Sequence, residues 1–229
     1  MATYFVTGAG SGIGEVLATR LHARGDLLVL LARNEERARQ LRERFPGAET
    51  VVADLAEPLR IAEAVGEQRL PSQIDALVHV AGVCDLGRID ALPVSTWQRQ
   101  LDVNLVGPAE LTRLLLPAIR ATRGQVLFVN SGAGLRTAPE WAAYAASKHG
   151  LKALADGLRG EEAANGVRVS SIFPGRTATP MQANVHEQEG RPYDPTVYIA
   201  PASVVTSILT MLDLPRDAQI PELMIRPND

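Results

Sequence analysis

The sequence contains one cysteine, few aromatic residues (4%) and no long apolar run. Cys84 has no second cysteine with which to form a disulfide, and no cluster of Cys and His has the spacing of a metal site, so we expect no bound metal and a reducing, cytoplasmic location. The N-terminal residues lack the basic opening and apolar core of a signal peptide, and no apolar run approaches the ~18 residues of a spanning helix. Membrane partners are therefore not expected.

Neither positive nor negative charges are concentrated in any part of the sequence. The 23 Lys and Arg residues nearly balance the 26 Asp and Glu residues, which gives a formal net charge of −3. This distribution has no basic footprint for a nucleic acid. Apolar residues make up 46% of the 229 residues, enough for one sizeable core, so we expect a single domain over residues 1–229.

Short β-branched apolar runs alternate with helix-like stretches along the chain. The expected strands are Thr3–Thr7, Leu27–Ala32, Glu49–Ala53, Ala76–Val80, Gln125–Asn130, Val167–Phe173 and, more weakly, Glu222–Arg226. The expected helices include Ile13–Arg24, Glu35–Arg44, Trp97–Arg120, Tyr144–Ala164 and Ala202–Leu212. Continuous apolar strands that alternate with helices are typical of a parallel sheet covered on both faces, so we predict an α/β, doubly wound, Rossmann-like fold of about seven strands. The Pro-rich, polar segment Arg176–Ala200 follows a strand, and we expect it to form a partly helical substrate flap over the carboxyl edge of the sheet.

A glycine-rich turn follows the first expected strand and leads into a helix. It contains Gly8, Ser11, Gly12, Ile13 and Gly14. Glycine permits positive φ angles, and its lack of a side chain lets backbone N–H groups and the helix N-terminus approach a pyrophosphate, although a tight turn without a ligand would show the same residues. The spacing Gly8-x-x-x-Gly12-x-Gly14 resembles that of the short-chain dehydrogenase/reductase family, and the resemblance covers nearly the whole chain.

The end of the second expected strand bears on the choice of coenzyme. A dinucleotide fold that prefers NAD places a carboxylate there, whereas this chain has Ala32 followed by Arg33. A guanidinium suits the 2′-phosphate of NADP, so we expect NADP(H) to be favoured over NAD. The other interpretation is that Arg33 is a solvated surface arginine.

The family resemblance implies further coenzyme contacts. Asp54 is similar to the family aspartate that binds the adenine amino group, although an aspartate in a turn or at a helix N-cap would look the same. The other implied contacts are Leu55, Ala81, Gly82, Pro174, Gly175, Thr177 and Thr179, together with Tyr144 and Lys148.

Tyr144 and Lys148 lie four residues apart, about one helical turn, so their side chains share a face. Reduction of a ketone needs a proton donor beside the carbonyl oxygen, and a phenol with a reference pKa of ~10 can serve if a neighbouring ammonium lowers that pKa. Lys148 is one of only two lysines among the 23 basic residues, which favours a specific role. We therefore expect Tyr144 to be the acid and base and Lys148 to lower its pKa.

The resemblance implies two more catalytic residues. Ser131, thirteen residues before Tyr144, resembles the family serine that binds the substrate oxygen. Asn104 resembles the family asparagine that perturbs its helix and holds a water in the proton relay to the lysine. Pro108, close behind Asn104, is a simpler cause of a helix kink.

The chain departs from the family pattern after the fourth expected strand. Where the family usually has Asn-Asn-Ala-Gly, this chain has His79-Val80-Ala81-Gly82. The usual first asparagine ties neighbouring strands together, so His79 must find another hydrogen bond or remain neutral and packed. We expect His79 to be a core histidine and not a ligand.

Together these residues predict an NADP(H)-dependent oxidoreductase that acts on a small or medium carbonyl or alcohol substrate. Arg136 or Arg176, near the mouth of the site, is a candidate partner for a substrate carboxylate. The alternatives are a non-catalytic NADP-binding sensor and an epimerase or dehydratase of the same fold; a hydrolase is disfavoured because Val129 stands where a nucleophile elbow needs glycine. The resemblance also implies a homodimer or homotetramer that pairs the helices over Trp97–Arg120 and Tyr144–Ala164.

Overall fold

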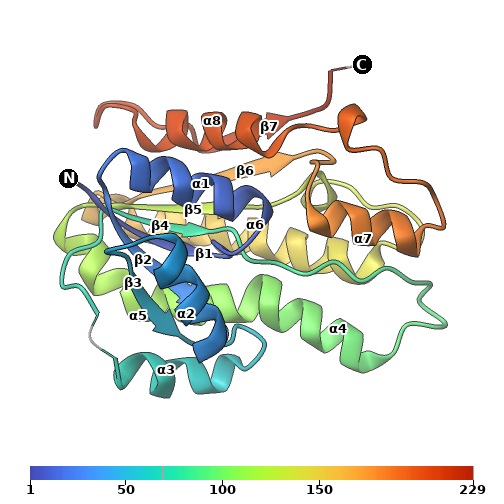
Figure 1. The fold of residues 1–229 in the computed structure, drawn as a ribbon, viewed down its shortest axis with the longest axis horizontal. Coiled ribbons are helices and arrows are strands. Elements are labelled where there is room, and N and C mark those ends of the chain that lie inside the picture. The colour runs from blue at the N-terminus through green and yellow to red at the C-terminus, as the bar shows by residue number, and fades with distance from the viewer. Residues whose placement is uncertain (69, 229) are drawn as a thin grey trace.

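The computed structural model describes residues 1–68 and 70–228. In this part of the chain seven parallel strands form one sheet in the order β3-β2-β1-β4-β5-β6-β7 (Figure 1). The strands are β1 (Thr3–Thr7), β2 (Leu27–Ala32), β3 (Glu49–Val52), β4 (Ala76–His79), β5 (Gln125–Val129), β6 (Arg168–Pro174) and β7 (Glu222–Ile225). The helices are α1 (Gly12–Ala23), α2 (Glu35–Arg44), α3 (Pro58–Gly66), α4 (Val94–Leu101), α5 (Gly107–Ala121), α6 (Ala142–Glu162), α7 (Pro180–Gln188) and α8 (Pro201–Leu212). The predicted doubly wound, Rossmann-like fold is confirmed.

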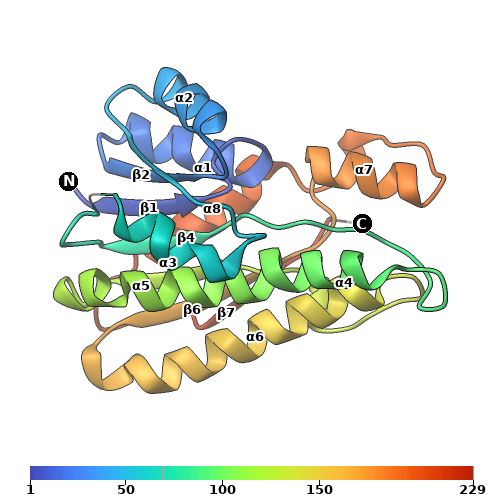
Figure 2. The same ribbon diagram turned by 90° about the horizontal axis from the view of Figure 1, so that it is seen from below.

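The strands send alternate side chains into two apolar layers. Tyr4 and Val6 of β1 belong to a buried cluster that includes residues of α1, α2 and α8, whereas Phe5 belongs to a second cluster with residues of α3, α5 and α6. Figure 2 shows these two groups of helices on opposite sides of the sheet. Because both faces of the strands are covered, the strands are continuous apolar runs in the sequence.

The strand order reverses between β1 and β4. From β1 the chain moves outward through β2 to β3, then returns to the other side of β1 and continues from β4 to β7. The loops that follow β1 and β4 therefore diverge at the carboxyl edge of the sheet. In a doubly wound fold this divergence opens the crevice in which ligands bind.

The stretch expected as one helix over Trp97–Arg120 is divided by a π-helical turn over Asp102–Val106. The N–H of Gly107 donates to the carbonyl oxygen of Asp102, five residues earlier, which is the π-helical pattern. A side chain at Gly107 would meet the carbonyl oxygen of Leu55 at 2.7 Å, so the glycine allows the start of α5 to pack closely on the loop after β3.

One helix of the structure, α3, is absent from those expected above. Pro58 lies in its first turn, and Ile61 and Val65, one turn apart, are its buried residues. A proline followed by apolar residues at helical spacing is a signal for a short helix. The signal is weak because α3 has only nine residues.

The expected substrate flap is partly helical, as predicted. It contains α7 and a 3-10 turn over Pro195–Val197, and a single β-bridge joins Thr177 to Ile199 at its base. Figure 1 shows α7 beyond the carboxyl ends of the strands, apart from the helices that cover the sheet. None of the helices in the described residues is long and apolar enough to cross a bilayer.

Candidate active site

A cavity of about 850 Å³ opens at the carboxyl edge of the sheet. The loops that follow β1 to β6 line it, together with the first two turns of α6 and α7. The sequence-predicted residues in its lining are Gly8, Ser11, Gly12, Ile13, Arg33, Asp54, Leu55, Ala81, Gly82, Ser131, Tyr144, Lys148, Pro174, Gly175, Thr177 and Thr179. Gly14 and Asn104 are buried and do not line the cavity.

The glycine turn forms one end of the cavity and leaves no room for side chains. Gly8 and Gly12 have φ angles of +73° and +55°, and a Cβ atom on Gly8 would lie 2.7 Å from the backbone nitrogen of Ala81. A Cβ on Gly14 would lie only 2.2 Å from the carbonyl oxygen of Gly8. Ser11 precedes α1 without capping it through its side chain, so the N–H groups of the first turn remain available to an anion. These features fit the pyrophosphate of a dinucleotide.

Two arginines line the cavity beyond the glycine turn. Arg33 follows β2 directly and is exposed, and Arg37 lies one turn further on, in the first turn of α2. A Cβ on Gly10 would meet the Arg37 guanidinium at 3.2 Å, so Arg37 lies against the turn. Arg37 is not among the residues predicted from the sequence, although its position four residues after Arg33, on the first turn of a helix, is a usable signal.

Asp54 lies at the same end of the cavity. One carboxylate oxygen of Asp54 accepts the N–H of Ala56 at 2.9 Å, which is the turn geometry considered as the alternative above. The second oxygen has no hydrogen-bond partner among the described residues, and Asp54 lines the cavity. The turn contact and an adenine contact are therefore compatible.

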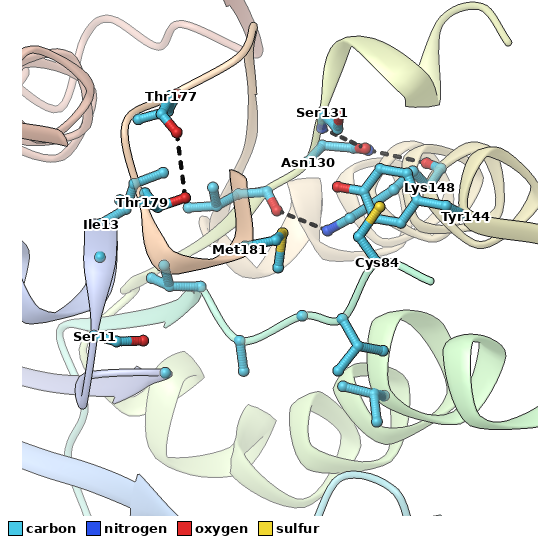
Figure 3. Close-up of a pocket in the computed structure, with 18 of the residues that line it drawn as sticks. Ser11, Ile13, Cys84, Asn130, Ser131, Tyr144, Lys148, Thr177, Thr179 and Met181 are labelled. Atoms are coloured by element: carbon cyan, nitrogen blue, oxygen red, sulfur yellow. Dashed lines mark hydrogen bonds between the residues drawn. The ribbon is translucent and has the colours of Figure 1, made fainter. Parts of the chain in front are cut away.

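Tyr144 and Lys148 point from α6 into the middle of the cavity, where Figure 3 shows them side by side. Both are buried, with 6% and 4% of their surfaces exposed. The Lys148 ammonium lies 5.9 Å from the centre of the Tyr144 ring and donates a hydrogen bond to the carbonyl oxygen of Val129 at 3.2 Å. The predicted juxtaposition of the two groups is confirmed.

The pKa values of this pair follow from burial. Burial lowers the pKa of Lys148 to about 8, because the charged form loses its hydration. Burial raises the pKa of Tyr144 above its ordinary value; the Cys84 thiol acts in the same direction, and contact with Ser131 acts against it. The expectation that Lys148 lowers the pKa of the phenol is therefore wrong for this structure. The loss of water around the phenol dominates, and the ammonium is bonded to Val129.

Ser131 lies at the carboxyl end of β5, beside Tyr144 (Figure 3). Its hydroxyl oxygen accepts the N–H of Ala133 at 3.1 Å, which leaves the hydroxyl proton free to be donated into the cavity.

Asn130 is a buried residue that the sequence analysis does not identify. Its side-chain oxygen accepts the N–H of Ser131 at 2.8 Å, and its side-chain nitrogen donates to the carbonyl oxygen of Lys148 at 3.1 Å. Asn130 thus links the strand end that carries Ser131 to the helix that carries Lys148. A side chain at Gly134 would lie 2.4 Å from the Asn130 oxygen, so the pair Asn130 and Gly134 is a signal that is visible only in three dimensions.

Asn104 lies in the π-helical turn, as its predicted perturbation of the helix requires. It is 1% exposed, and its amide both accepts the N–H and donates to the carbonyl oxygen of Val83, each at 2.9 Å. The same amide nitrogen donates to Ser147 at 3.0 Å, and the Ser147 hydroxyl donates to the carbonyl oxygen of Tyr144 at 2.7 Å. Asn104 therefore holds the loop after β4 and the helix of Tyr144 together. Pro108 lies in the first turn of α5, directly after the π-helical turn, and has no N–H to donate to that turn.

His79 is a neutral core histidine, as predicted. It is 2% exposed, stacks on Phe128 with 4.9 Å between ring centres, and its Nε2 is 2.9 Å from the hydroxyl of Thr112. Burial, with a smaller effect from Lys148, lowers the pKa of His79 to about 3. The tie between neighbouring strands comes instead from the Thr7 hydroxyl, which accepts the N–H groups of Val80 and Ala81 at 3.0 and 3.1 Å.

The end of the cavity opposite the glycine turn is apolar. Cys84, Tyr144 and Val185 form a buried cluster there, and Trp141 and Met181 pack against it. The Cys84 thiol lies close to Tyr144 in Figure 3, and burial raises the pKa of this thiol to about 12.

The two candidate carboxylate-binding arginines differ in their surroundings. Arg176 forms a two-point ion pair with Glu189, at 2.5 and 2.9 Å, and its guanidinium lies 5.5 Å from the ring of Trp141. Its charge is already matched, so the expectation of a substrate contact is not supported for Arg176. Arg136 is exposed at the cavity rim, and no ion pair found in the described residues includes it.

The fold and the carboxyl-edge residues define a dinucleotide-binding α/β protein. Residues 2–190 match the family model described as short chain dehydrogenase. The chain therefore belongs to the short-chain dehydrogenase/reductase family of oxidoreductases, whose members bind a nicotinamide coenzyme.

Individual relatives agree with this assignment. The chain is 36% identical over 204 residues to dehydrogenase/reductase SDR family member 7B from Bos taurus, an alignment that covers 84% of this chain and 63% of that protein. The chain thus spans less than two thirds of the length of this relative. Among solved structures, the closed form of a serine dehydrogenase complexed with NADP+ has a TM-score of 0.88 at 25% identity and covers 98% of this chain and 94% of its own. An alcohol dehydrogenase from Thermococcus sibiricus complexed with 5-hydroxy-NADP has a TM-score of 0.78 at 26% identity and covers 99% of this chain and 97% of its own.

Proposed function

We propose that this protein is an NADP(H)-dependent oxidoreductase that interconverts a small or medium carbonyl compound and its alcohol, with Tyr144 as acid and base. The observation that carries the proposal is the meeting of Tyr144, Ser131 and Lys148 in one cavity whose other end is the glycine turn. The family membership of the chain supports the reaction class. The domain that performs the reaction extends over residues 1–229.

Each polar group in the middle of the cavity has a distinct role. When bound, the nicotinamide supplies or accepts the hydride. Tyr144, which is protonated at neutral pH because burial raises its pKa, donates its proton to the carbonyl oxygen during reduction. The free hydroxyl proton of Ser131 makes a second hydrogen bond to the same oxygen and stabilises its developing charge. Lys148, with a pKa of about 8, gains and loses a proton near neutral pH and so returns a proton toward the phenol.

Asn104 does not line the cavity but supports the residues that do. Its amide fixes the backbone of Val83 and, through Ser147, the turn of α6 that carries Tyr144. We assign it to the catalytic group by its place in the proton relay to Lys148, in which it would help to hold a water. A Cβ on Gly82 would lie 3.1 Å from the Asn104 oxygen and 3.6 Å from the Lys148 ammonium, so both groups approach the same side of Gly82.

Two arginines favour NADP(H) over NAD. Arg33 and Arg37 line the cavity at the end of β2, where no carboxylate follows the strand directly. Two guanidinium groups attract a doubly charged 2′-phosphate, whereas a carboxylate at the same place would repel it. Both solved relatives described above hold NADP or a derivative of it, which supports the same choice.

The apolar end of the cavity holds the body of the substrate. Trp141, Met181 and Val185 supply apolar contacts within reach of Tyr144. Arg136, at the rim, is the residue that would bind a carboxylate on the far end of the substrate. We therefore favour a carbonyl compound with an apolar body, with or without an acidic end.

The working form is proposed to be a homodimer or homotetramer. Val94 on α4 and Val106 in the π-helical turn are 82% and 42% exposed on the surface of the helices that the family resemblance pairs. Light scattering coupled to size-exclusion chromatography should give a mass of at least twice 24.6 kDa. A particle of the monomer mass at micromolar concentration would refute this part of the proposal.

The central experiment is a panel of carbonyls and alcohols assayed in parallel with NADPH and NADH. We expect turnover of at least one substrate with NADPH, and a fall of about 10²–10⁴-fold in Tyr144→Phe, the range typical of a lost general acid. Tyr144→Phe should still bind NADPH, with a loss of affinity no larger than that of one hydrogen bond, because only the phenol oxygen is removed.

Two results of the panel would favour the alternatives. Tight NADPH binding without turnover of any substrate would point to the coenzyme-binding sensor. Conversion of a substrate with no net change in coenzyme absorbance would point to an epimerase or dehydratase.

A further inference from the structure

The segment Val83–Leu86, which follows β4, has no strand beside it in the described part of the chain. Its successive residues bond alternately to two sets of side chains, which is the pattern of an extended backbone. An extended backbone without a neighbouring strand leaves its N–H and C=O groups to find other partners. Here side-chain amides take the place of the missing strands on both edges of the segment.

Two of these amides come from α4 and the π-helical turn. Asn104 pairs with both the N–H and the C=O of Val83, at 2.9 Å each. Gln100, four residues earlier and fully buried, pairs in the same way with Asp85, accepting its N–H at 3.1 Å and donating to its C=O at 2.9 Å. Residues 83 and 85 face the same edge of an extended segment, so one helix face holds that edge.

The third amide comes from the flap. Gln188, the last residue of α7, accepts the N–H of Leu86 at 2.7 Å and donates to the C=O of Cys84 at 3.2 Å. These groups lie on the opposite edge of the segment from those bound by Gln100 and Asn104. The segment is therefore held on one edge by Gln100 and Asn104 and on the other by the flap, and Gln188 is the flap residue that holds it.

The segment that these three amides hold forms part of the cavity wall. The Cys84 side chain lies in the cavity beside Tyr144 (Figure 3), and its cluster includes Val185 of α7. A shift of Cys84 would change the space in which a substrate carbonyl must meet the phenol.

We propose that Gln188 is a positioning residue that locks the flap onto Val83–Leu86 and so sets the wall of the substrate pocket. The kinetic consequence rests on the proposed function, whereas the structural consequence does not. Coenzyme binding is spared, because the glycine turn and the two cavity arginines lie at the other end of the cavity.

The test uses the single cysteine of the chain as a probe. Cys84 is 8% exposed and its thiol pKa is raised to about 12, so it should react slowly with a disulfide reagent such as dithionitrobenzoate under native conditions. In Gln188→Leu two hydrogen bonds to the segment are lost, and we expect labelling at least about tenfold faster, from more frequent local opening. Glu187→Ala is the matched control and should label at the wild-type rate, because Glu187 is an exposed neighbour on the same helix whose side chain makes no hydrogen bond in the described residues.

A graded variant and a stability measurement exclude a general loss of structure. Gln188→Glu keeps an acceptor for Leu86 but has no donor for the carbonyl of Cys84, so its labelling rate should lie between those of the wild type and Gln188→Leu. Gln188 is exposed, so its replacement leaves no cavity, and the urea midpoint of Gln188→Leu should stay close to that of the wild type. Wild-type labelling in Gln188→Leu, or faster labelling matched by a lowered urea midpoint, would overturn the inference.

Kinetics separate this inference from the proposed function. With any substrate found in the panel, Gln188→Leu should raise KM for that substrate about tenfold or more, in line with the two lost hydrogen bonds, and leave KM for NADPH unchanged. An equal rise in both KM values would contradict the positioning role. If neither the wild type nor the variant turns over a substrate but labelling is accelerated, the positioning role stands and the proposed function fails.

Discussion

The Lys148 ammonium donates to the carbonyl oxygen of Val129 and thereby sits at the end of β5, 5.9 Å from the centre of the Tyr144 ring. The buried ammonium has one protein acceptor among the described residues and an open side toward the cavity. It is therefore positioned to act on two neighbours, the phenol and a bound coenzyme.

The affinity for NADPH should depend on the charge of Lys148. Because burial lowers the pKa of Lys148 to about 8, the group is an ammonium below that pH and a neutral amine above it. We expect the dissociation constant of NADPH, measured by fluorescence titration, to change little from pH 7 to 7.5, where the 2′-phosphate is ionised, and to rise by about tenfold by pH 9.5, the scale of one charged hydrogen bond. In Lys148→Met this rise should disappear.

Lys152→Met is the control for that titration. Lys152 lies one turn further along α6 and is paired with Asp156 and Glu222 at the surface, away from the cavity. Its removal should leave the pH dependence of NADPH binding intact. Loss of the pH step in Lys152→Met as well would show that the step does not come from the site.

Coenzyme preference should depend on Arg37 as well as Arg33. Each replacement by alanine removes one guanidinium from the end of β2, and we expect KM for NADPH to rise about 10–100-fold, as for a lost charged hydrogen bond, with little change for NADH. Arg39→Ala is the control, because Arg39 lies on the same helix but pairs with Glu36 and Glu43 at the surface. An equal loss with both coenzymes in Arg37→Ala would indicate a structural role.

His79 should make the protein less stable as the pH falls. Its pKa is about 3 in the folded chain and about 6.5 in an unfolded one, so between these pH values the unfolded chain binds more protons than the folded chain. The free energy of unfolding therefore decreases as the pH falls. His79→Asn loses the stacking on Phe128 and should be less stable at pH 7 by about 1–3 kcal/mol. The difference between the two proteins should shrink as the pH falls from 6.5 to 5, because asparagine does not titrate.

Urea unfolding at several pH values measures this effect. His149→Asn, which replaces an exposed histidine on α6, serves as the control. If the gap between wild type and His79→Asn stays constant with pH, His79 is not the source.

Arg136 and Arg176 should respond differently to the charge of the substrate. Arg136→Ala should raise KM for carboxylate-bearing carbonyl substrates by about two- to fivefold, the scale of an ion pair at an exposed site, and spare neutral substrates. Arg176→Ala breaks the pair with Glu189 and the contact with Trp141, so it should change both substrate types alike. A selective loss of acidic substrates in Arg176→Ala would reverse the assignment.

The sequence predicts best those features that depend on spacing along the chain. Gly8 and Gly12 have positive φ angles, and Gly14 packs against the carbonyl oxygen of Gly8 in the same turn. Tyr144 and Lys148 share a helix face by virtue of their separation. Such local geometry follows from the period of the element alone.

Features that depend on contacts between distant elements could not be predicted in the same way. Arg176 directly follows a strand, as a cavity residue would, yet its charge is paired with Glu189, which lies thirteen residues later in the flap. The raised pKa of Tyr144 depends on how completely the surrounding elements exclude water, which no spacing records. Asn130 likewise acquires its role only when α6 packs against the end of β5.

The π-helical turn at Asp102–Val106 limits the number of residues that can lie between α4 and α5, in addition to dividing the two helices. A residue of an α-helix advances by about 100°, so deleting one residue from this turn would restore regular winding and swing Asn104 away from Val83 by roughly that angle. Gln100, on the near side of the turn, would keep its hold on Asp85. We therefore expect insertions and deletions to be tolerated only at the outer ends of α4 and α5, because the turn between them holds the loop after β4 at a set distance from α6, the helix that carries Tyr144.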